Sequence, residues 1–514
     1  MRIKSISPGR AGKSALHLGL LLFAALTYHP AIAKTYHATN ASNLVSLTGQ
    51  LAPGDTLFVA PGNYDVETWN LSGLTGTSEK WFHFIAEPGA VIRSTSGCCN
   101  LVQIRESSYL HLKGFEITMA KANPGIDGIN VSGSYSHHLL FEDLYIHEMT
   151  ANGISVFSNK ADHLELHNSE LARMEGSGMY WGYPNRDIVS DIVVEGNYIH
   201  HCPVDPNQET DYGFQFKGWG HRARIINNVF HDVGGTTRAG LIVYYGKKPL
   251  AGDDPKDVNV VAGNVLWNCR NEGITVMSDA IVENNIVWSA VTGINIQTYN
   301  DTSFSGPNYV ENLQIRNNTV FRCQSACISI SGWSNAAPTV SFTGNAAYQA
   351  TAGATAISGS IGNALSAGNV AYGAASIPGV AKGNGLGDFL LATASGLPPA
   401  LDFFPAVGSP LRDAVDAQTC PETDFNGTMR PQGPKCDAGA YEAGTAANPG
   451  WKIKEGFKLV DPNTSIRIRK PASPRHGRIS GESETRRADG RTIGNKGFGL
   501  ALFPPPAKMG KDRL

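Results

Sequence analysis

The chain has 514 residues, a formal net charge of −2, 57 glycines and a charged fraction of 17%. The small net charge conceals an asymmetry, because residues 34–450 contain 23 basic and 38 acidic residues, whereas residues 451–514 contain 15 basic and 6 acidic residues. An acidic body argues against general nucleic-acid binding and leaves room for divalent cations. Many glycines and few charges indicate a β-rich protein with tight turns.

The first 33 residues have the pattern of a secretory signal peptide. Basic residues at positions 2, 4, 10 and 13 precede an apolar stretch from Ala15 to Leu26, and Ala31-Ile32-Ala33 is a small-x-small cleavage site. We therefore expect a secreted or periplasmic protein that is cleaved after Ala33. The apolar stretch is short for a bilayer span, and no later stretch approaches about 20 apolar residues, so no membrane span is predicted.

Export permits disulfide bonds, and the chain has eight cysteines. Cys420 and Cys436 bracket a polar loop and are the preferred pair. Cys323 with Cys327, and Cys202 with Cys269, are further possibilities. Neither a CxxC pair nor a His/Cys spacing indicates a zinc site.

The body of the chain begins with a short helical pattern at Leu44–Leu51, a Pro-Gly-Asp turn and a predicted strand at Thr56–Ala60. The phrase PGDTLFVAPGNY in this stretch resembles the N-terminal cap of right-handed parallel β-helix proteins, notably polysaccharide lyases. In that family a helix covers the open end of the solenoid. The resemblance implies the same role for the helix predicted here.

A glycine followed by apolar-x-apolar recurs along the next part of the chain at intervals of 25, 25, 35, 27, 33 and 20 residues. Intervals that vary by whole loops are typical of a solenoid and do not suit a propeller. No amphipathic segment of helix length interrupts the repeat, so a right-handed parallel β-helix is predicted over residues 34–445. The glycines are Gly128, Gly153, Gly178, Gly213, Gly240, Gly273 and Gly293.

A second phrase follows most of these turns and begins with asparagine. Asparagines at the same bend of successive turns can pair their amides, as in the Asn ladders of stacked strands. The predicted ladder contains Asn197, Asn228, Asn264, Asn285, Asn318 and Asn345.

The C-terminal part of the body is expected to close the solenoid. Residues 350–400 are rich in Ala, Gly and Ser, so the last turns should be thin. Gly408–Glu442 resembles a closing phrase of secreted β-helix proteins, which implies a C-terminal cap. Residues 446–514 are basic, polar and without periodicity, and are predicted to be a disordered tail.

Aligning the turns on their glycines predicts which side chains become neighbours, because equivalent positions stack at the strand spacing. Residues one and three after each glycine should point inward, and residues two and four after it should point outward. One outward column contains Asn130, Ser155, Tyr180, Gln215, Ile242, Thr275 and Asn295, and the next contains Ser132, Phe157, Gly182, Lys217, Tyr244, Met277 and Gln297. The asparagine phrase ends in a third column, expected to be exposed, of His147, His200, His231, Trp267 and Trp288.

The stretch from Asp211 to Asp232 carries the most candidate chemistry. A lysine beside other cations loses pKa and can abstract a proton, so Lys217 is the candidate base. Arg238 would neutralise a substrate carboxylate, and His231 or His200 would assist. Substrate contacts are assigned to two aromatic platform residues and three polar neighbours, namely Tyr180, Tyr244, Gln215, Asp211 and Glu175.

The phrase GFQFKGWGHRARIINNVFHDVG resembles a lysine-bearing turn of secreted β-helix proteins of the lyase-like group. Lysine-based polysaccharide lyases of this fold carry their base on such a turn, and Lys217 is the matching position. The sequence departs from two related patterns, since it lacks the paired-Asp and Gly-His-Gly signature of β-helix polygalacturonases and the Asp-Pro-His-Asp signature of alginate epimerases.

Three functions are consistent with these observations. The leading prediction is a lyase that cleaves a uronate-containing polysaccharide by β-elimination. A non-catalytic envelope or adhesion protein that binds glycan is the alternative, and a glycoside hydrolase using Asp211 and Glu175 is the third. We expect a monomer whose partner is a polysaccharide.

Calcium is the cofactor to consider, because acidic loops occur at Pro203–Asp211 and Ala251–Asp257. Neither loop matches the EF-hand pattern, and no complete set of lyase calcium ligands is present.

Overall fold

The computed structural model describes residues 32–97, 100–183, 187–218, 220–244, 258–297, 312–331, 340–390 and 403–444. The chain divides into two compact units, Met1–Phe457 and Lys458–Leu514, and all described residues belong to the first. Most of the predicted signal peptide, the loop at 251–257 and the basic tail lie outside the described residues. Those assignments therefore stay predictions.

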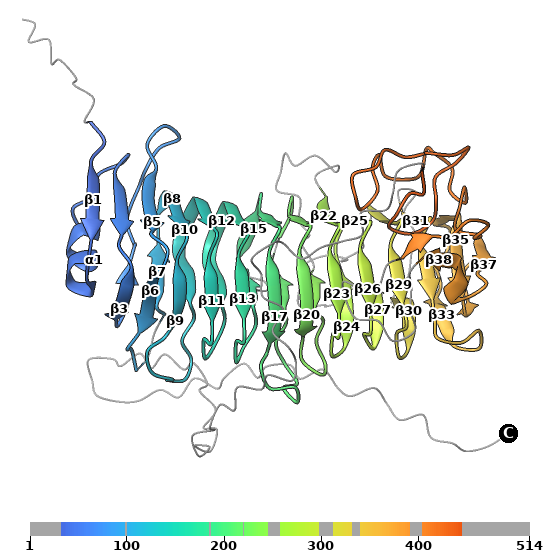
Figure 1. Cartoon of the computed structure of the whole chain (residues 1–514), viewed down its shortest axis with the longest axis horizontal. Coiled ribbons are helices and arrows are strands. Elements are labelled where there is room, and N and C mark those ends of the chain that lie inside the picture. Colours follow the sequence, from blue (N-terminus) through green and yellow to red (C-terminus); the bar gives the residue numbers. More distant parts are fainter. Residues whose placement is uncertain are drawn as a thin grey trace, which may run out of the picture. The chain divides into compact units, whose positions relative to one another are not determined.

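The first unit is a stack of parallel rungs, each rung being one turn of the chain with three β faces (Figure 1). Two long strands, β10 (Ile129–Glu142) and β12 (Ile154–His167), run from the first face into the second and join them into one 24-stranded sheet. The third face is a separate 13-stranded sheet. This is the architecture that the repeat predicts.

The strands of the first face, besides β10 and β12, are β4 (Trp69–Asn70), β7 (Val102–Arg105), β14 (Met179–Trp181), β18 (Phe214–Phe216), β21 (Leu241–Val243), β24 (Glu272–Val276), β27 (Thr292–Gln297), β30 (Ala326–Ser331), β33 (Thr355–Gly359) and β36 (Ala374–Ala375). Those of the second face are β1 (Thr35–Ala38), β2 (Thr56–Val59), β5 (Phe82–Ala86), β8 (Ser108–Lys113), β15 (Ile188–Ser190), β16 (Val193–Glu195), β19 (Arg224–Ile226), β22 (Asn259–Ala262), β25 (Ala280–Glu283), β28 (Leu313–Arg316), β31 (Ser341–Thr343) and β34 (Leu365–Ala367). Those of the third face are β3 (Gly62–Val66), β6 (Ala90–Ser94), β9 (Glu116–Met119), β11 (Tyr145–His147), β13 (Glu170–Ala172), β17 (Tyr198–Cys202), β20 (Val229–Val233), β23 (Val265–Trp267), β26 (Ile286–Trp288), β29 (Thr319–Phe321), β32 (Ala346–Tyr348), β35 (Asn369–Tyr372) and β37 (Val380–Lys382).

A short helix lies at the start of the stack. Helix α1 spans Ala41–Thr48, three residues earlier than predicted, because the side chain of Asn40 caps it by accepting a hydrogen bond from the N–H of Asn43 at 2.9 Å. The helix buries Leu44 and Thr48 against the first rungs.

The recurring glycines allow neighbouring rungs to approach closely. A Cβ atom on Gly153 would lie 2.6 Å from the carbonyl oxygen of Gly178, and one on Gly178 would lie 2.6 Å from that of Gly213. Both distances are shorter than any real contact of a Cβ atom, so a side chain at these positions would push the rungs apart. The glycine repeat is therefore a packing requirement of the stack.

The predicted asparagine ladder is present and buried between the second and third faces. Each amide nitrogen donates to the amide oxygen of the next asparagine at 3.0 Å, from Asn197 through to Asn369. Each amide nitrogen also donates to a backbone carbonyl, as Asn285 does to Val261 at 2.8 Å. The residue before each ladder asparagine has a positive φ, for example 58° at Asn227 and 54° at Asn284. Asparagine tolerates that conformation, which explains the Asn-Asn pairs in the sequence.

We expect Asn285→Leu to destabilise the fold by about 2–4 kcal/mol, because the buried N–H of Asn264 and the carbonyl of Val261 would both lose their partner. The measurement is the shift of the chemical denaturation midpoint. Asn63→Leu, on the exposed side of β3, is the control and should leave the midpoint nearly unchanged. An unchanged midpoint for Asn285→Leu would show that the ladder does not stabilise the stack.

The C-terminal segment packs against the outside of the rungs that contain β26 and β29. Phe403 contacts Trp288 and Phe321, with ring centroids 6.1 and 5.1 Å apart. The short antiparallel pair β38 (Phe389–Leu390) and β39 (Phe404–Pro405) lies at its start, after a 3-10 turn at Leu386–Asp388. The segment that was predicted to cap the solenoid therefore covers the outer flank of these rungs.

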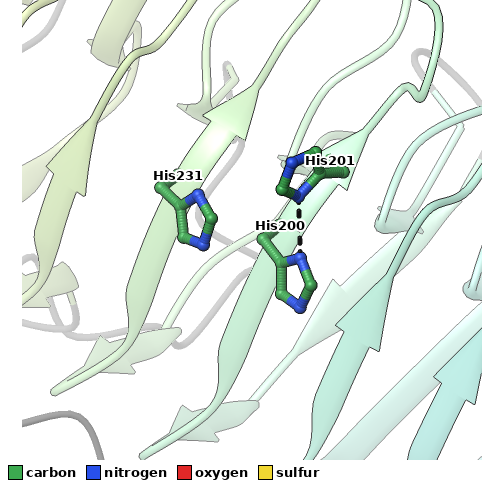
Figure 2. Close-up of side chains that lie close together, drawn as sticks. All are labelled: His200, His201 and His231. Atoms are coloured by element: carbon green, nitrogen blue, oxygen red, sulfur yellow. Dashed lines mark hydrogen bonds between the residues drawn. The ribbon is translucent and has the colours of Figure 1, made fainter. Parts of the chain in front are cut away.

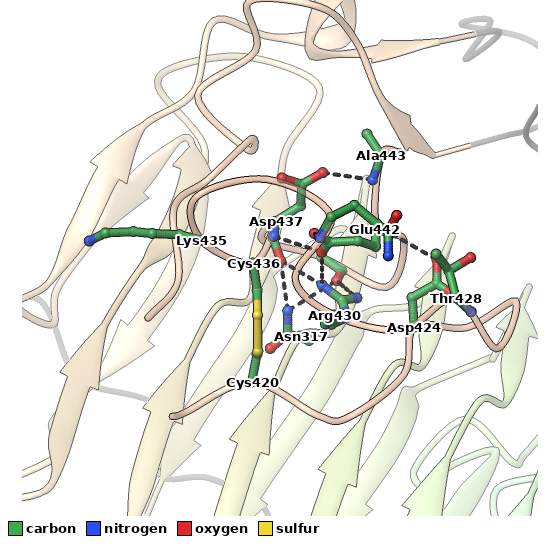
Figure 3. Close-up of polar contacts among 12 residues, drawn as sticks. Asn317, Cys420, Asp424, Thr428, Arg430, Lys435, Cys436, Asp437, Glu442 and Ala443 are labelled. Carbon is green, nitrogen blue, oxygen red and sulfur yellow. Dashed lines mark hydrogen bonds and ion pairs between the residues drawn. A yellow bond between two sulfur atoms is a disulfide. The ribbon is translucent and has the colours of Figure 1, made fainter. Parts of the chain in front are cut away.

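Buried ionic contacts hold this segment together (Figure 3). Arg430 donates to Glu442 at 3.0 Å and to the backbone carbonyls of Asp437 and Gly439 at 2.7 and 2.9 Å. The predicted disulfide between Cys420 and Cys436 is confirmed. The other two proposed pairs are not formed, since Cys202, Cys269, Cys323 and Cys327 are free, buried thiols.

Candidate active site

Lys217 leaves the first face at the end of β18, in the middle of the stack. Phe214 and Phe216 alternate with it and are fully buried in the core. The backbone N–H of Lys217 donates to the carbonyl of Trp181 on the rung before, at 2.8 Å. The alternation that buries the two phenylalanines therefore directs the lysine outward, as the sequence predicts.

The ammonium group of Lys217 lies among three tyrosine rings. Its Nζ atom is 4.5 Å from the ring centroid of Tyr212, 5.3 Å from that of Tyr244 and 5.4 Å from that of Tyr180. Tyr180 belongs to the rung before and Tyr244 follows β21 on the rung after, so three successive rungs build the cage. A cation over aromatic faces is attracted to them, which positions the amine.

Burial lowers the pKa of Lys217 from its ordinary value of 10.5 to about 7, with a further contribution from the nearby Arg238 guanidinium. The Asp211 carboxylate raises the pKa of Lys217, but its effect is smaller than that of burial and Arg238. An amine with this pKa is partly neutral at pH 7 and can accept a proton, as a general base must.

A hydrogen-bond network fixes the polar side of the cage. Ser177 donates to Asp211 at 3.2 Å and accepts from Gln215 at 2.9 Å. Asp211 also accepts from Gln208 at 2.9 Å, and its backbone has a φ of 89°. Such a conformation is costly for a residue other than glycine, and it is often retained at functional sites.

The sequence prediction gave no role to two residues of this cluster, Tyr212 and Glu272. Tyr212 is buried, and its burial raises its pKa to about 12. The charges of Arg238 and Glu272 both act on Tyr212, which places them in the same cluster. Burial also raises the pKa of Glu272. Tyr212 immediately precedes a repeat glycine, and the position before the glycine is the signal that could have identified it.

The predicted register is confirmed, but the predicted exposure of the first outward column is wrong. Asn130 pairs in register with Ser155, Tyr180 with Gln215, and Gln215 with Ile242. Six members of the column are nevertheless buried, and Tyr180 alone is half-buried. Buried polar groups of this column find hydrogen-bond partners, since Asn130 donates to Ser155 at 2.7 Å and Gln215 donates to Ser177 at 2.9 Å.

His200 and His231 lie on the third face, not on the face that carries Lys217. They occupy paired positions of β17 and β20, and both are buried, so the expected exposure of this column is also wrong. Their rings stack with centroids 5.1 Å apart, and His231 stacks in turn on Trp267. Glu170 and Asp232 bind their ring nitrogens. Their described contacts do not include Lys217, and a role beside it gains no support.

Of the remaining residues predicted to contact substrate, some lie in the Lys217 cluster and one does not. Asp211, Gln215 and Arg238 belong to the Lys217 cluster, whereas Glu175 is exposed and has no described contact with Lys217. In the predicted acidic loop Pro203–Asp211, the Asp205 carboxylate accepts a hydrogen bond from the backbone N–H of Asn207. The Asp211 carboxylate accepts from Ser177 and Gln208. Among the described residues, the groups of three or more His, Cys, Asp or Glu side chains that could hold a metal do not include this loop, and a calcium cofactor stays a prediction.

Residues 127–308 match a protein family described as the right handed beta helix region. The protein is a right-handed parallel β-helix. Solved structures with a similar fold include pectate lyase Pel9A, with 16% identity, 80% of this chain and 97% of that chain covered, and a TM-score of 0.42. An alginate lyase from Paenibacillus sp. str. FPU-7 has 16% identity, 58% and 94% coverage and a TM-score of 0.37. The GH136 lacto-N-biosidase from Eubacterium ramulus has 10% identity, 68% coverage of each chain and a TM-score of 0.47.

These likenesses concern the β-helix fold alone. No curated protein matches the sequence. Within the part of the β-helix chain that the structure describes, no helix has the length and apolar character needed to cross a bilayer.

Proposed function

We propose that this protein is a carbohydrate-active β-helix enzyme that cleaves a uronate-containing polysaccharide by β-elimination, with Lys217 as the base. The observation that supports the proposal is a lysine whose pKa is lowered to about 7 inside a cage of three tyrosines, with an arginine beside it.

The proposed reaction uses each part of the cluster. The neutral amine of Lys217 removes the proton from the sugar carbon next to the carboxylate, and the Arg238 guanidinium pairs with that carboxylate so that charge can develop on it. The electron pair then forms a carbon–carbon double bond as the bond to the glycosidic oxygen breaks. A half-buried phenol of the cage, Tyr180 or Tyr244, supplies the proton to the leaving oxygen. The faces of these rings also suit the C–H faces of sugars.

The test is incubation of the purified protein with alginate, pectate and glycosaminoglycans, followed by the ultraviolet absorbance of unsaturated sugar ends. Binding of a glycan without product would favour the non-catalytic alternative. Reducing ends without ultraviolet absorbance would indicate a hydrolase. The exposure of Glu175 and the hydrogen-bonded state of Asp211 give no support to that third function.

The pH dependence follows from the pKa of Lys217. The base must be deprotonated, so kcat/KM should rise about tenfold per pH unit below pH 7 and reach a plateau above about pH 8. Initial rates between pH 5 and 9 measure this profile. A profile that falls through this range would contradict an amine base. The pKa of Lys217 can also be measured without substrate. The rate at which an acylating reagent modifies Lys217 is followed as a function of pH and compared with the rates at surface lysines.

A further inference from the structure

Three histidine rings converge on the third face, within the neighbouring strands β17 and β20 (Figure 2). His200, His201 and His231 each offer one ring nitrogen, and these three atoms all lie within 4.8 Å of one another. The Nδ1 atoms of His200 and His201 are 2.9 Å apart. The cluster is separate from Lys217, which the first face carries.

Backbone conformation explains how sequence neighbours can face each other. Adjacent residues of a strand normally point to opposite sides. His201 has a φ of 53°, which breaks the alternation and lets its ring meet that of His200, with centroids 5.1 Å apart and planes at 83°. The register of the stack places His231 beside His200, because the two residues pair across β17 and β20.

The hydrogen bonds of His200 direct one lone pair into the cluster. Its Nε2 atom lies 3.1 Å from a carboxylate oxygen of Glu170, which can only accept, so Nε2 carries the proton. The Nδ1 atom is then unprotonated and faces Nδ1 of His201. A carboxylate that holds the far nitrogen of a histidine in this way is the usual support of a metal ligand.

We propose that His200, His201 and His231 bind a divalent transition-metal ion, with Zn²⁺ as the best match. Two nitrogens of a tetrahedral zinc site lie about 3.3 Å apart, for Zn–N distances of about 2.0–2.1 Å, which is close to the separation of the His200 and His201 nitrogens. Imidazole nitrogen favours zinc, nickel or copper over calcium. His201 has to move its proton from Nδ1 to Nε2. Both ring nitrogens of His231 are occupied, Nδ1 by Asp232 and Nε2 by the phenol of Tyr198 at 2.6 Å, so His231 has to exchange its Asp232 contact for the metal while Tyr198 keeps the far nitrogen. Asp232 then stands beside the site as a further carboxylate.

The ion would join two successive rungs at a buried position. Because it would bind the folded stack and not the unfolded chain, it would stabilise the fold in proportion to its concentration. This role does not depend on the proposed lyase activity.

A second histidine cluster on the second face provides a matched control. His137 and His138 form a similar adjacent pair, with Nδ1 atoms 2.7 Å apart, next to Asp162. Asp162 is already bound by the ammonium of Lys160 at 3.2 Å and by the phenol of Tyr135 at 2.9 Å. A fixed positive charge at this carboxylate opposes a second cation.

The experiment is titration of the full, tag-free protein with Zn²⁺ after treatment with a chelator, followed by calorimetry and metal analysis. We expect one ion per chain, a higher Tm with Zn²⁺, and visible absorption typical of tetrahedral nitrogen ligation when Co²⁺ is used. His201→Ala should weaken binding at least about 100-fold and abolish the Tm increase, while His138→Ala should leave both unchanged. Glu170→Gln, which keeps the ligands, should weaken binding about 10–100-fold.

Circular dichroism checks the fold of each variant. The proposal would be overturned by the lack of stoichiometric binding to the unmodified protein. It would also be overturned if neither His201→Ala nor Glu170→Gln weakened binding, or if binding were lost in His138→Ala alone.

Discussion

Lys217→Met is expected to lower kcat/KM for polysaccharide cleavage by about 10²–10⁴-fold, because that is the usual contribution of a positioned general base. Methionine keeps most of the volume of the lysine stem but cannot accept a proton. Lys217→Arg should lose as much, since an arginine stays charged at every relevant pH. The ultraviolet assay on the best substrate of the panel measures both losses.

A control variant and a stability measurement separate the loss of chemistry from a loss of folding. Lys160 also lies over a tyrosine, 4.4 Å from the ring centroid of Tyr135, but on another part of the stack, so Lys160→Met should keep full activity. Lys217→Met should fold stably, because the lowered pKa of Lys217 shows that its buried amine destabilises the folded protein. The pKa is about 7 in the folded protein and ordinarily 10.5, so the unfolded chain binds more protons between these values.

Lys217 therefore costs stability at neutral pH, and the cost fades as the pH rises toward 10.5. Removing the amine should stabilise the protein by about 1–3 kcal/mol at pH 7, and by less at pH 10. Normal activity of Lys217→Met on a substrate that the unmodified protein cleaves would rule out Lys217 as the base.

Arg430→Met should produce the largest loss of stability, about 3–5 kcal/mol, because it leaves a buried carboxylate without its partner. The side chains of Arg430 and Glu442 are both fully buried. Besides its bonds within the C-terminal segment, Arg430 donates to the side chain of Asn284 at 3.3 Å, which ties the segment to the rungs. Chemical denaturation, followed by intrinsic fluorescence of the tryptophans near Phe403, measures the effect.

Matched variants show whether the buried charge is the cause. Lys435→Ala removes an exposed ion pair with Asp416 from the same segment and should change the stability by less than about 1 kcal/mol. Adding Glu442→Gln to Arg430→Met should recover part of the loss, because it neutralises the stranded charge while keeping an oxygen for the N–H of Gln432. If the double variant is as unstable as the single one, the loss comes from packing and not from charge.

The local sequence determined the architecture of this protein. Gly178 and its equivalents mark positions where the next carbonyl leaves no room for a Cβ atom, so the repeat could be read directly as a stack. The Asn-Asn pairs could be read in the same way, because one asparagine adopts a positive φ and the next supplies the ladder amide. The register that followed placed Tyr180, Lys217 and Tyr244 on neighbouring rungs.

Tertiary structure decided which side chains are buried and which groups share a site. Period-two alternation tells inside from outside of a rung, but it does not reveal what covers the outside, so the buried state of Gln215, His200 and His231 could not be predicted. The same limit applies to contacts made by an irregular backbone. Tyr212 joins the lysine cage from a position before the repeat glycine, and His201 meets His200 through a positive φ. The pKa of Lys217 depends on this burial, because desolvation and not the number of nearby charges is its main cause.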